Sequence, residues 1–167
     1  MVTKQDILIK WTAYTFATLL LLLLRELTRS VTLFGVAPLL PPILVGAVAS
    51  LEEYRYSAYY ALLLGVLCDL ALPVPFPCLY TVSFSLAVFL SCYLAEHVMQ
   101  PGFFSALVSS VAAFLFVDLF RFLALLPVTK PVLLTFALLA VRELPVSLLL
   151  LPLCYPLLRA VHRRFTL

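Results

Sequence analysis

The sequence predicts an all-α integral membrane protein in which residues 1–167 form a single membrane domain of six transmembrane helices. Its 167 residues are 65% hydrophobic and only 11% charged, and their mean hydropathy is +1.16. Soluble domains carry about 25% charged residues, and a small soluble fold could not remove so much apolar surface from water. The same figures exclude a disordered chain, a collagen-like fibre and a disulfide-stapled secreted module.

Six apolar segments are long enough to cross the hydrocarbon core of a bilayer, which takes about 20 mostly apolar residues of helix. The runs are long and lack the period-two alternation of barrel strands, so helices are expected. The expected spans cover residues 7–24, 31–51, 54–72, 79–95, 103–126 and 132–158. The connections between these spans are too short to hold a soluble domain.

Polar residues and prolines delimit the segments. The first ends at Arg25-Glu26, and a proline-rich turn at 73–77 separates the third from the fourth. The second segment has no charge but contains Pro38, Pro41 and Pro42. Its helix therefore either kinks near the outer end of the span or begins at Pro42 after a loop.

The distribution of Lys and Arg predicts that both termini are cytoplasmic. Six basic residues lie on the face that holds the termini, and three lie on the other face. The six are Lys4, Lys10, Arg55, Arg159, Arg163 and Arg164, and the three are Arg25, Arg29 and Lys130. The C-terminal basic cluster suits the anionic inner leaflet of the lipid bilayer. The net charge of +3 gives no indication of nucleic-acid binding.

Five ionisable residues remain at membrane depth, where each costs on the order of 2.5–3.5 kcal/mol unless it is paired or faces a polar interior. They are Asp69, Asp118, Arg121, Arg142 and Glu143. At 1.5 Å per residue, all five fall between the outer end and the middle of their spans, at depths of about 5 to 17 Å. Asp118 and Arg121 share a helix face. We expect a nearly neutral network that joins the third, fifth and sixth spans.

This network has a structural and a functional interpretation. Salt bridges that fix helix packing are the structural one, and a polar pocket or a docking point for another protein is the functional one. Catalysis is not expected, because the chain lacks a Gly-x-Ser-Gly serine, a His-Glu-x-x-His pair and a glycine-rich phosphate loop. The proline-rich second and sixth spans leave a transporter with broken helices as an alternative.

No metal or cofactor is expected. The four cysteines form no C-x-x-C pair and have no histidine at metal-ligand spacing, so they are interpreted as small buried hydrophobic residues. Two pairs of small residues at i, i+4 favour close helix packing. They are Ala13 with Ala17 in the first span and Gly46 with Ser50 in the second.

Four features follow one another between residues 38 and 161. A charge-poor, proline-containing span precedes a Glu-Glu-Tyr-Arg turn at 52–55, and a Gly-x-x-x-Asp motif ends the third span at Asp69. Leu-Tyr opens the fourth span, and Arg-Glu-Leu-Pro at 142–145 enters the last one ahead of a basic tail. In this order the features resemble the rod shape-determining protein MreD family. Pro75-Phe76-Pro77 stands where that family usually has a glycine.

The resemblance implies a non-catalytic subunit of the cell-elongation machinery in the cytoplasmic membrane of a rod-shaped bacterium. Members work with the membrane-anchored MreC, and through it with the MreB filament and the peptidoglycan synthases. The implied fold is similar to that of the substrate-binding component of energy-coupling-factor transporters. Binding of a vitamin in an outward-facing pocket is therefore the alternative function, with Ala13 and Ala17 docking on the transport partner.

We interpret the protein as a scaffold whose outer charges hold a groove for partner helices. Gly65 and Pro145 are expected to set helix shape within it. Asp69 is expected to pair with Arg121 or Arg142, so that Asp69→Ala would weaken assembly.

Overall fold

The computed structural model describes residues 4–27, 38–71, 77–97, 102–126 and 133–166. Every regular element in these ranges is a helix, which confirms the all-α class. The helices are α1 (Lys4–Leu27), α2 (Pro41–Leu51), α3 (Tyr54–Ala71), α4 (Leu79–His97), α5 (Phe103–Leu125), α6 (Leu133–Leu148) and α7 (Leu151–Thr166). They number one more than the six expected segments, because the last segment forms two helices.

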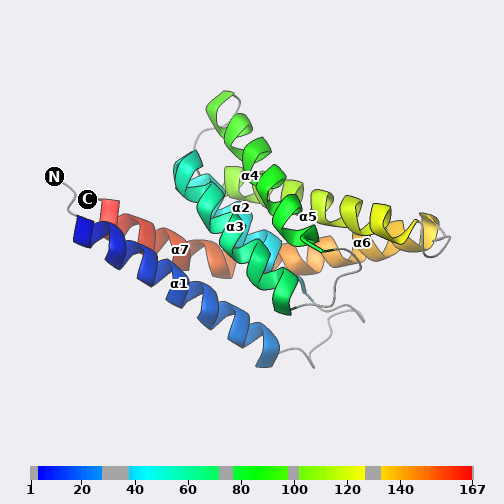
Figure 1. The fold of residues 1–167 in the computed structure, drawn as a ribbon, viewed down its shortest axis with the longest axis horizontal. Helices are drawn as coiled ribbons and strands as arrows, with labels where there is room; N and C mark the ends of the chain where they lie inside the picture. The colour runs from blue at the N-terminus through cyan, green and yellow to red at the C-terminus, as the bar shows by residue number, and fades with distance from the viewer. Residues whose placement is uncertain (1–3, 28–37, 72–76, 98–101, 127–132, 167) are drawn as a thin grey trace.

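Helix α2 lies at the centre of the bundle, where it packs against α3, α4, α5 and α7 (Figure 1). All of its residues except Leu51 are buried. The helix begins at Pro41, which agrees with the alternative of a late start near Pro42, and residues 31–37 of the expected span lie outside the described residues. Prolines fit here because the first turn of a helix needs no N–H donor. With 11 residues the helix is only about 16 Å long, about half of a bilayer core.

The last expected span is broken between α6 and α7, whose axes differ by 48°. Pro152 occupies the second position of α7. Its ring has no N–H for the carbonyl of Leu148 and would clash with that carbonyl in a continuous helix, so α6 ends at Leu148. Pro145 lies inside α6 without ending it.

Helices α1 and α7 run side by side, so that the start of α1 and the end of α7 lie at the same end of the molecule (Figure 1). Tyr14 of α1 is fully buried, and Ala17 is buried while Ala13 is half-buried. The Thr18 hydroxyl and the Tyr60 hydroxyl are 2.8 Å apart, which links α1 to α3.

Two glycines permit the closest helix contacts. A Cβ atom on Gly46 would lie 2.4 Å from the backbone nitrogen of Ser110, so α2 and α5 touch through their backbones. A Cβ atom on Gly65 would lie 2.5 Å from the Cα of Thr81, which places α3 against α4 in the same way. Ser50, one turn beyond Gly46, is buried and donates a hydrogen bond to the carbonyl of Ala47. Gly65 is thus a helix-contact residue.

One helix, over Phe103–Ala124, is long and apolar enough to cross a membrane in the described part of the chain, and α6 with α7 adds a second if the bent pair is one span. Large apolar side chains are exposed on the outer faces of the bundle, as at Phe16, Leu70 and Phe104. Small hydroxyl side chains are buried between the helices, at Ser57, Ser83, Ser105, Ser109, Ser110 and Ser147.

Candidate functional site

Arg121 forms the centre of a cluster of charged and aromatic side chains that we call the Arg121 cluster: Tyr80, Asp118, Arg121 and Glu143. Its guanidinium lies 3.8 Å from the Asp118 carboxylate on α5 and 3.7 Å from the Glu143 carboxylate on α6. The same group donates a hydrogen bond to the Tyr80 hydroxyl and lies 5.5 Å from the centre of that ring. The cluster therefore holds α4, α5 and α6 together with charge-assisted contacts.

Among the described residues Asp69 makes no ion pair with Arg121 or Arg142, so the expectation that it would pair with one of them is wrong. Its carboxylate accepts hydrogen bonds from the backbone N–H of Tyr80 at 2.9 Å and of Thr81 at 3.1 Å. The Thr81 hydroxyl donates a third bond of 2.6 Å. Because α4 starts at Leu79, these two amides belong to its first turn, whose N–H groups have no partner within the helix.

The Asp69 carboxylate thus acts as an N-cap supplied by another helix. Cys78, the residue just before α4, has a φ of 64° and a carbonyl that accepts a bond from Val82 N–H. The thiol of Cys78 is a weak hydrogen-bond acceptor and caps the helix poorly. Asp69 at the end of α3 caps α4 instead. The negative charge also suits the positive end of the helix dipole. Asp69 reaches the Arg121 cluster only through Tyr80, to whose N–H it is bonded.

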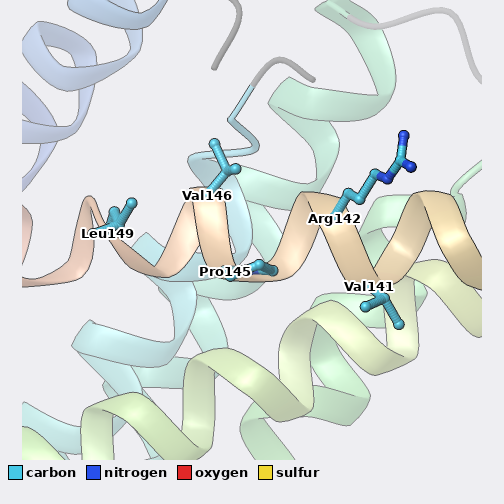
Figure 2. Close-up of a pocket in the computed structure, with 5 residues that line it drawn as sticks. All are labelled: Val141, Arg142, Pro145, Val146 and Leu149. Carbon is cyan, nitrogen blue, oxygen red and sulfur yellow. The ribbon is translucent and has the colours of Figure 1, made fainter. Parts of the chain in front are cut away.

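Arg142 is also outside the cluster. It is exposed and makes no ion pair within the ranges that the structure describes, whereas the adjacent Glu143 is buried and faces Arg121. Neighbouring residues on a helix point about 100° apart, which explains the different surroundings. Arg142 borders a hollow of about 510 Å³, whose described lining comes from α6 and from Leu149 in the turn after it (Figure 2). The network is therefore smaller than the sequence predicts.

A second cluster, the Glu52 cluster, was not predicted as a site. It consists of Lys10, Tyr14, Glu52 and His162 and joins α1, the α2–α3 turn and α7. The Glu52 carboxylate is 2.7 Å from Lys10 Nζ and 2.7 Å from His162 Nδ1, and the Tyr14 hydroxyl donates a bond of 2.8 Å to it. Only 4% of the Glu52 side chain is exposed, so three donors surround a buried carboxylate.

The hydrogen-bond donors around Glu52 determine its ionisation state. Burial alone would raise its pKa, but the hydrogen bonds from Lys10, His162 and Tyr14 together outweigh burial, and the pKa of Glu52 lies below its usual value. The carboxylate is therefore charged at neutral pH, and it anchors the paired helices α1 and α7 to the turn at the start of α3.

The Glu52 cluster was hard to foresee from the sequence. Glu52 lies 38 residues from Tyr14 and 110 from His162, and only the fold brings them together. The available hint was the Glu-Glu-Tyr-Arg turn, where a charged residue directly follows an uncharged span.

In both clusters, side chains of opposite charge neutralise one another. Within the described ranges, no group of three His, Cys, Asp or Glu side chains could hold a metal ion. The four cysteines form no disulfide with one another, and three of them are buried. Comparison with models of protein families, with curated proteins and with solved structures gives no significant match to this chain.

Proposed function

We propose that this chain is a non-catalytic, multi-pass subunit of the bacterial cell-elongation machinery, with six spans in the cytoplasmic membrane and both termini in the cytoplasm. It scaffolds an MreC-like membrane protein and, through that protein, the MreB filament and the peptidoglycan synthases. The proposal rests on the resemblance of the sequence to the MreD family and on the way this structure uses its charges.

The observation that carries the proposal is the Arg121 cluster. In a bilayer a charged side chain is stable only when it is paired or faces a polar interior. Arg121 has a carboxylate partner on its own helix and another on α6, and the Tyr80 hydroxyl occupies a third side. Side chains bound to one another in this way hold helices in place, which is what a scaffold requires.

The surface supports a membrane location. Exposed side chains on the outer faces of α1, α3 and α5 are large and apolar, while serines are buried between the helices. Small hydroxyl residues at helix interfaces are typical of proteins that pack within lipid, where burial of leucine gives no net gain. A soluble bundle would show the reverse pattern.

Depletion in a rod-shaped host tests the function. Loss of the protein should turn rods into spheres, and purification of the tagged protein in mild detergent should recover an MreC-like partner. The wild-type gene and Arg55→Gln, which changes an exposed arginine at the start of α3, should both restore rods. Arg121→Gln should restore them poorly, because it leaves two acids near each other without a cation.

A vitamin bound to the purified protein, together with unchanged cell shape after depletion, would contradict the proposal. That outcome would favour the substrate-binding component of an energy-coupling-factor transporter, and the transport ATPases would then be recovered as partners instead.

A further inference from the structure

Helix α7 has one face packed into the bundle and an opposite face that is exposed. The buried face is formed by residues that recur every three or four positions: Leu151, Cys154, Tyr155 and Leu158. Four exposed residues recur at intervals of four, three and four, so they lie in one line along the helix. We call them the α7 stripe: Pro152, Pro156, Arg159 and Arg163.

The α7 stripe changes from apolar to basic along its length. Its first half consists of two prolines, and the neighbouring Leu153 is 65% exposed beside them. Its second half consists of two exposed arginines, and the whole of α7 contains no Asp or Glu. The helix therefore presents an apolar surface that is followed directly by positive charge.

The first of the two arginines is held in place by aromatic side chains. The Arg159 guanidinium lies 6.0 Å from the centre of the Tyr155 ring, within the range of a cation–π contact. Tyr155 is itself buried, and its ring packs edge-on against Phe103 of α5 at 5.5 Å. Arg163 follows one turn later on the same side of α7. Two guanidinium groups placed in this way can both donate hydrogen bonds to the oxygens of one phosphate.

The spacing along α7 matches the layers of a bilayer. Arg159 and Arg163 are four residues apart, or about 6 Å along the helix axis. The polar headgroup layer on each side of the hydrocarbon core is about 5 to 7 Å thick. The prolines precede the arginines by one to two turns, where the acyl chains of the same leaflet begin. A free phosphate ion or an acidic protein segment would use only the basic half of the stripe, whereas a phospholipid uses both halves.

The buried face of the same helix end is anchored to the bundle. His162 Nδ1 lies 2.7 Å from the Glu52 carboxylate in the turn between α2 and α3. A lipid on the exposed face and Glu52 on the buried face would therefore hold one turn of α7 from two sides. Bound lipid should thus stabilise the folded chain.

We propose that the α7 stripe is a binding site for an anionic phospholipid, whose phosphate is bound by Arg159 and Arg163 and whose acyl chain lies along Pro152 and Pro156. The proposal rests on the membrane location proposed above and is independent of the scaffold function. It assigns a lipid ligand to a specific set of residues.

Native mass spectrometry of the full chain tests the site. The chain, purified in a neutral detergent, is mixed with equal amounts of dioleoyl phosphatidylglycerol and dioleoyl phosphatidylcholine, and the lipid-bound forms are counted by mass. Wild type should prefer phosphatidylglycerol. Each arginine should contribute about fivefold, so the preference should fall about 25-fold in the double variant Arg159→Gln/Arg163→Gln.

Arg164→Gln is the matched control, because Arg164 is also exposed at the end of α7 but points about 100° away from Arg163. Its preference should change less than twofold. Because the substituted arginines are exposed, all variants should unfold close to the wild-type temperature in detergent without added lipid, which circular dichroism checks.

Thermal unfolding of wild type gives a measurement that needs no variant. Phosphatidylglycerol should raise the melting temperature more than phosphatidylcholine does. Glycerol 3-phosphate, which carries a phosphate without acyl chains, should leave it unchanged.

Several results would overturn the lipid site. Wild type would bind the two lipids equally, or the preference would survive in the double variant. An equal loss in Arg164→Gln would show that the basic end of α7 attracts lipid without a specific site. Displacement of phosphatidylglycerol by glycerol 3-phosphate would show a site for free phosphate. Displacement by a polyglutamate peptide would show a surface for an acidic protein segment.

The outcomes for the lipid site and for the function are separable. If depletion rounds the cells but wild type does not distinguish the two lipids, the lipid site is wrong and the scaffold function is unaffected. If the preference depends on the α7 stripe while depleted cells stay rod-shaped, the lipid site is supported and the cell-shape function is wrong. Absence of the chain from the membrane fraction of its host would contradict both.

Discussion

The Thr81 hydroxyl donates a 2.6 Å hydrogen bond to Asp69 Oδ2, so the last turn of α3 holds the first turn of α4. The same carboxylate receives two backbone N–H groups of α4. At this point Gly65, one turn before Asp69, lets the two helices approach to backbone contact. The Gly-x-x-x-Asp motif thus has a local physical role in joining two consecutive helices.

Replacing Asp69 by alanine should lower the free energy of unfolding by about 1–2 kcal/mol, because two amides of the first turn of α4 lose their acceptor. Asp69→Asn should cost less, since one side-chain oxygen remains. Thermal unfolding in detergent measures both. In a double-mutant cycle, Asp69→Ala and Thr81→Val should be less than additive. Additive effects would show that the 2.6 Å bond contributes nothing to stability.

A methyl group on Gly46 should force α2 and α5 apart, since the added carbon would lie 2.4 Å from the Ser110 backbone. We expect Gly46→Ala to lower stability by about 1–3 kcal/mol. Gly102→Ala is the matched control, because the extended backbone at Gly102, with a φ of 179°, suits any residue. Equal melting temperatures for the two variants would contradict the close contact.

Neutralising the buried Glu52 should weaken the junction of α1 and α7. Glu52→Gln keeps the shape of the side chain but removes the charge that pairs with Lys10 and His162. Because Lys10 is partly exposed, the loss of stability is moderated. We expect the free energy of unfolding to fall by about 1–3 kcal/mol. The neighbouring Glu53→Gln changes an exposed carboxylate and should alter the melting temperature little. Similar losses in both variants would count against a special role for Glu52.

Acidification should reproduce part of this loss. Because the pKa of Glu52 is lower in the folded protein than its ordinary value of about 4.5, the unfolded chain binds the proton more readily. The contribution of Glu52 is therefore complete above pH 4.5 and declines as the pH falls through the lowered pKa. Melting temperatures of wild type and Glu52→Gln should converge in that acidic range. A constant difference down to pH 3 would show that the charge is not involved.

Local sequence patterns predicted the helical class and the positions of most helix ends, because apolar runs and prolines act over a few residues. The Asp118–Arg121 contact followed from the same local geometry, and it occurs in the structure. The partners of Asp69 and Glu52 could not be predicted from local sequence patterns. Asp69 binds backbone amides, which every residue carries, and Glu52 binds side chains brought close only by the packing of α1 on α7. Neither relationship leaves a pattern in one sequence.

The Glu52 cluster has a consequence for synthesis of the chain. Lys10 and Tyr14 emerge from the ribosome before Glu52, whereas His162 follows it by 110 residues. Until α7 has been made, the carboxylate lacks one of its three donors and the surface of α1 that packs on α7 stays uncovered. A truncated product would therefore carry an incompletely satisfied acid beside an open apolar helix, the kind of defect that cellular proteases recognise. Assembly is completed only when the last helix arrives.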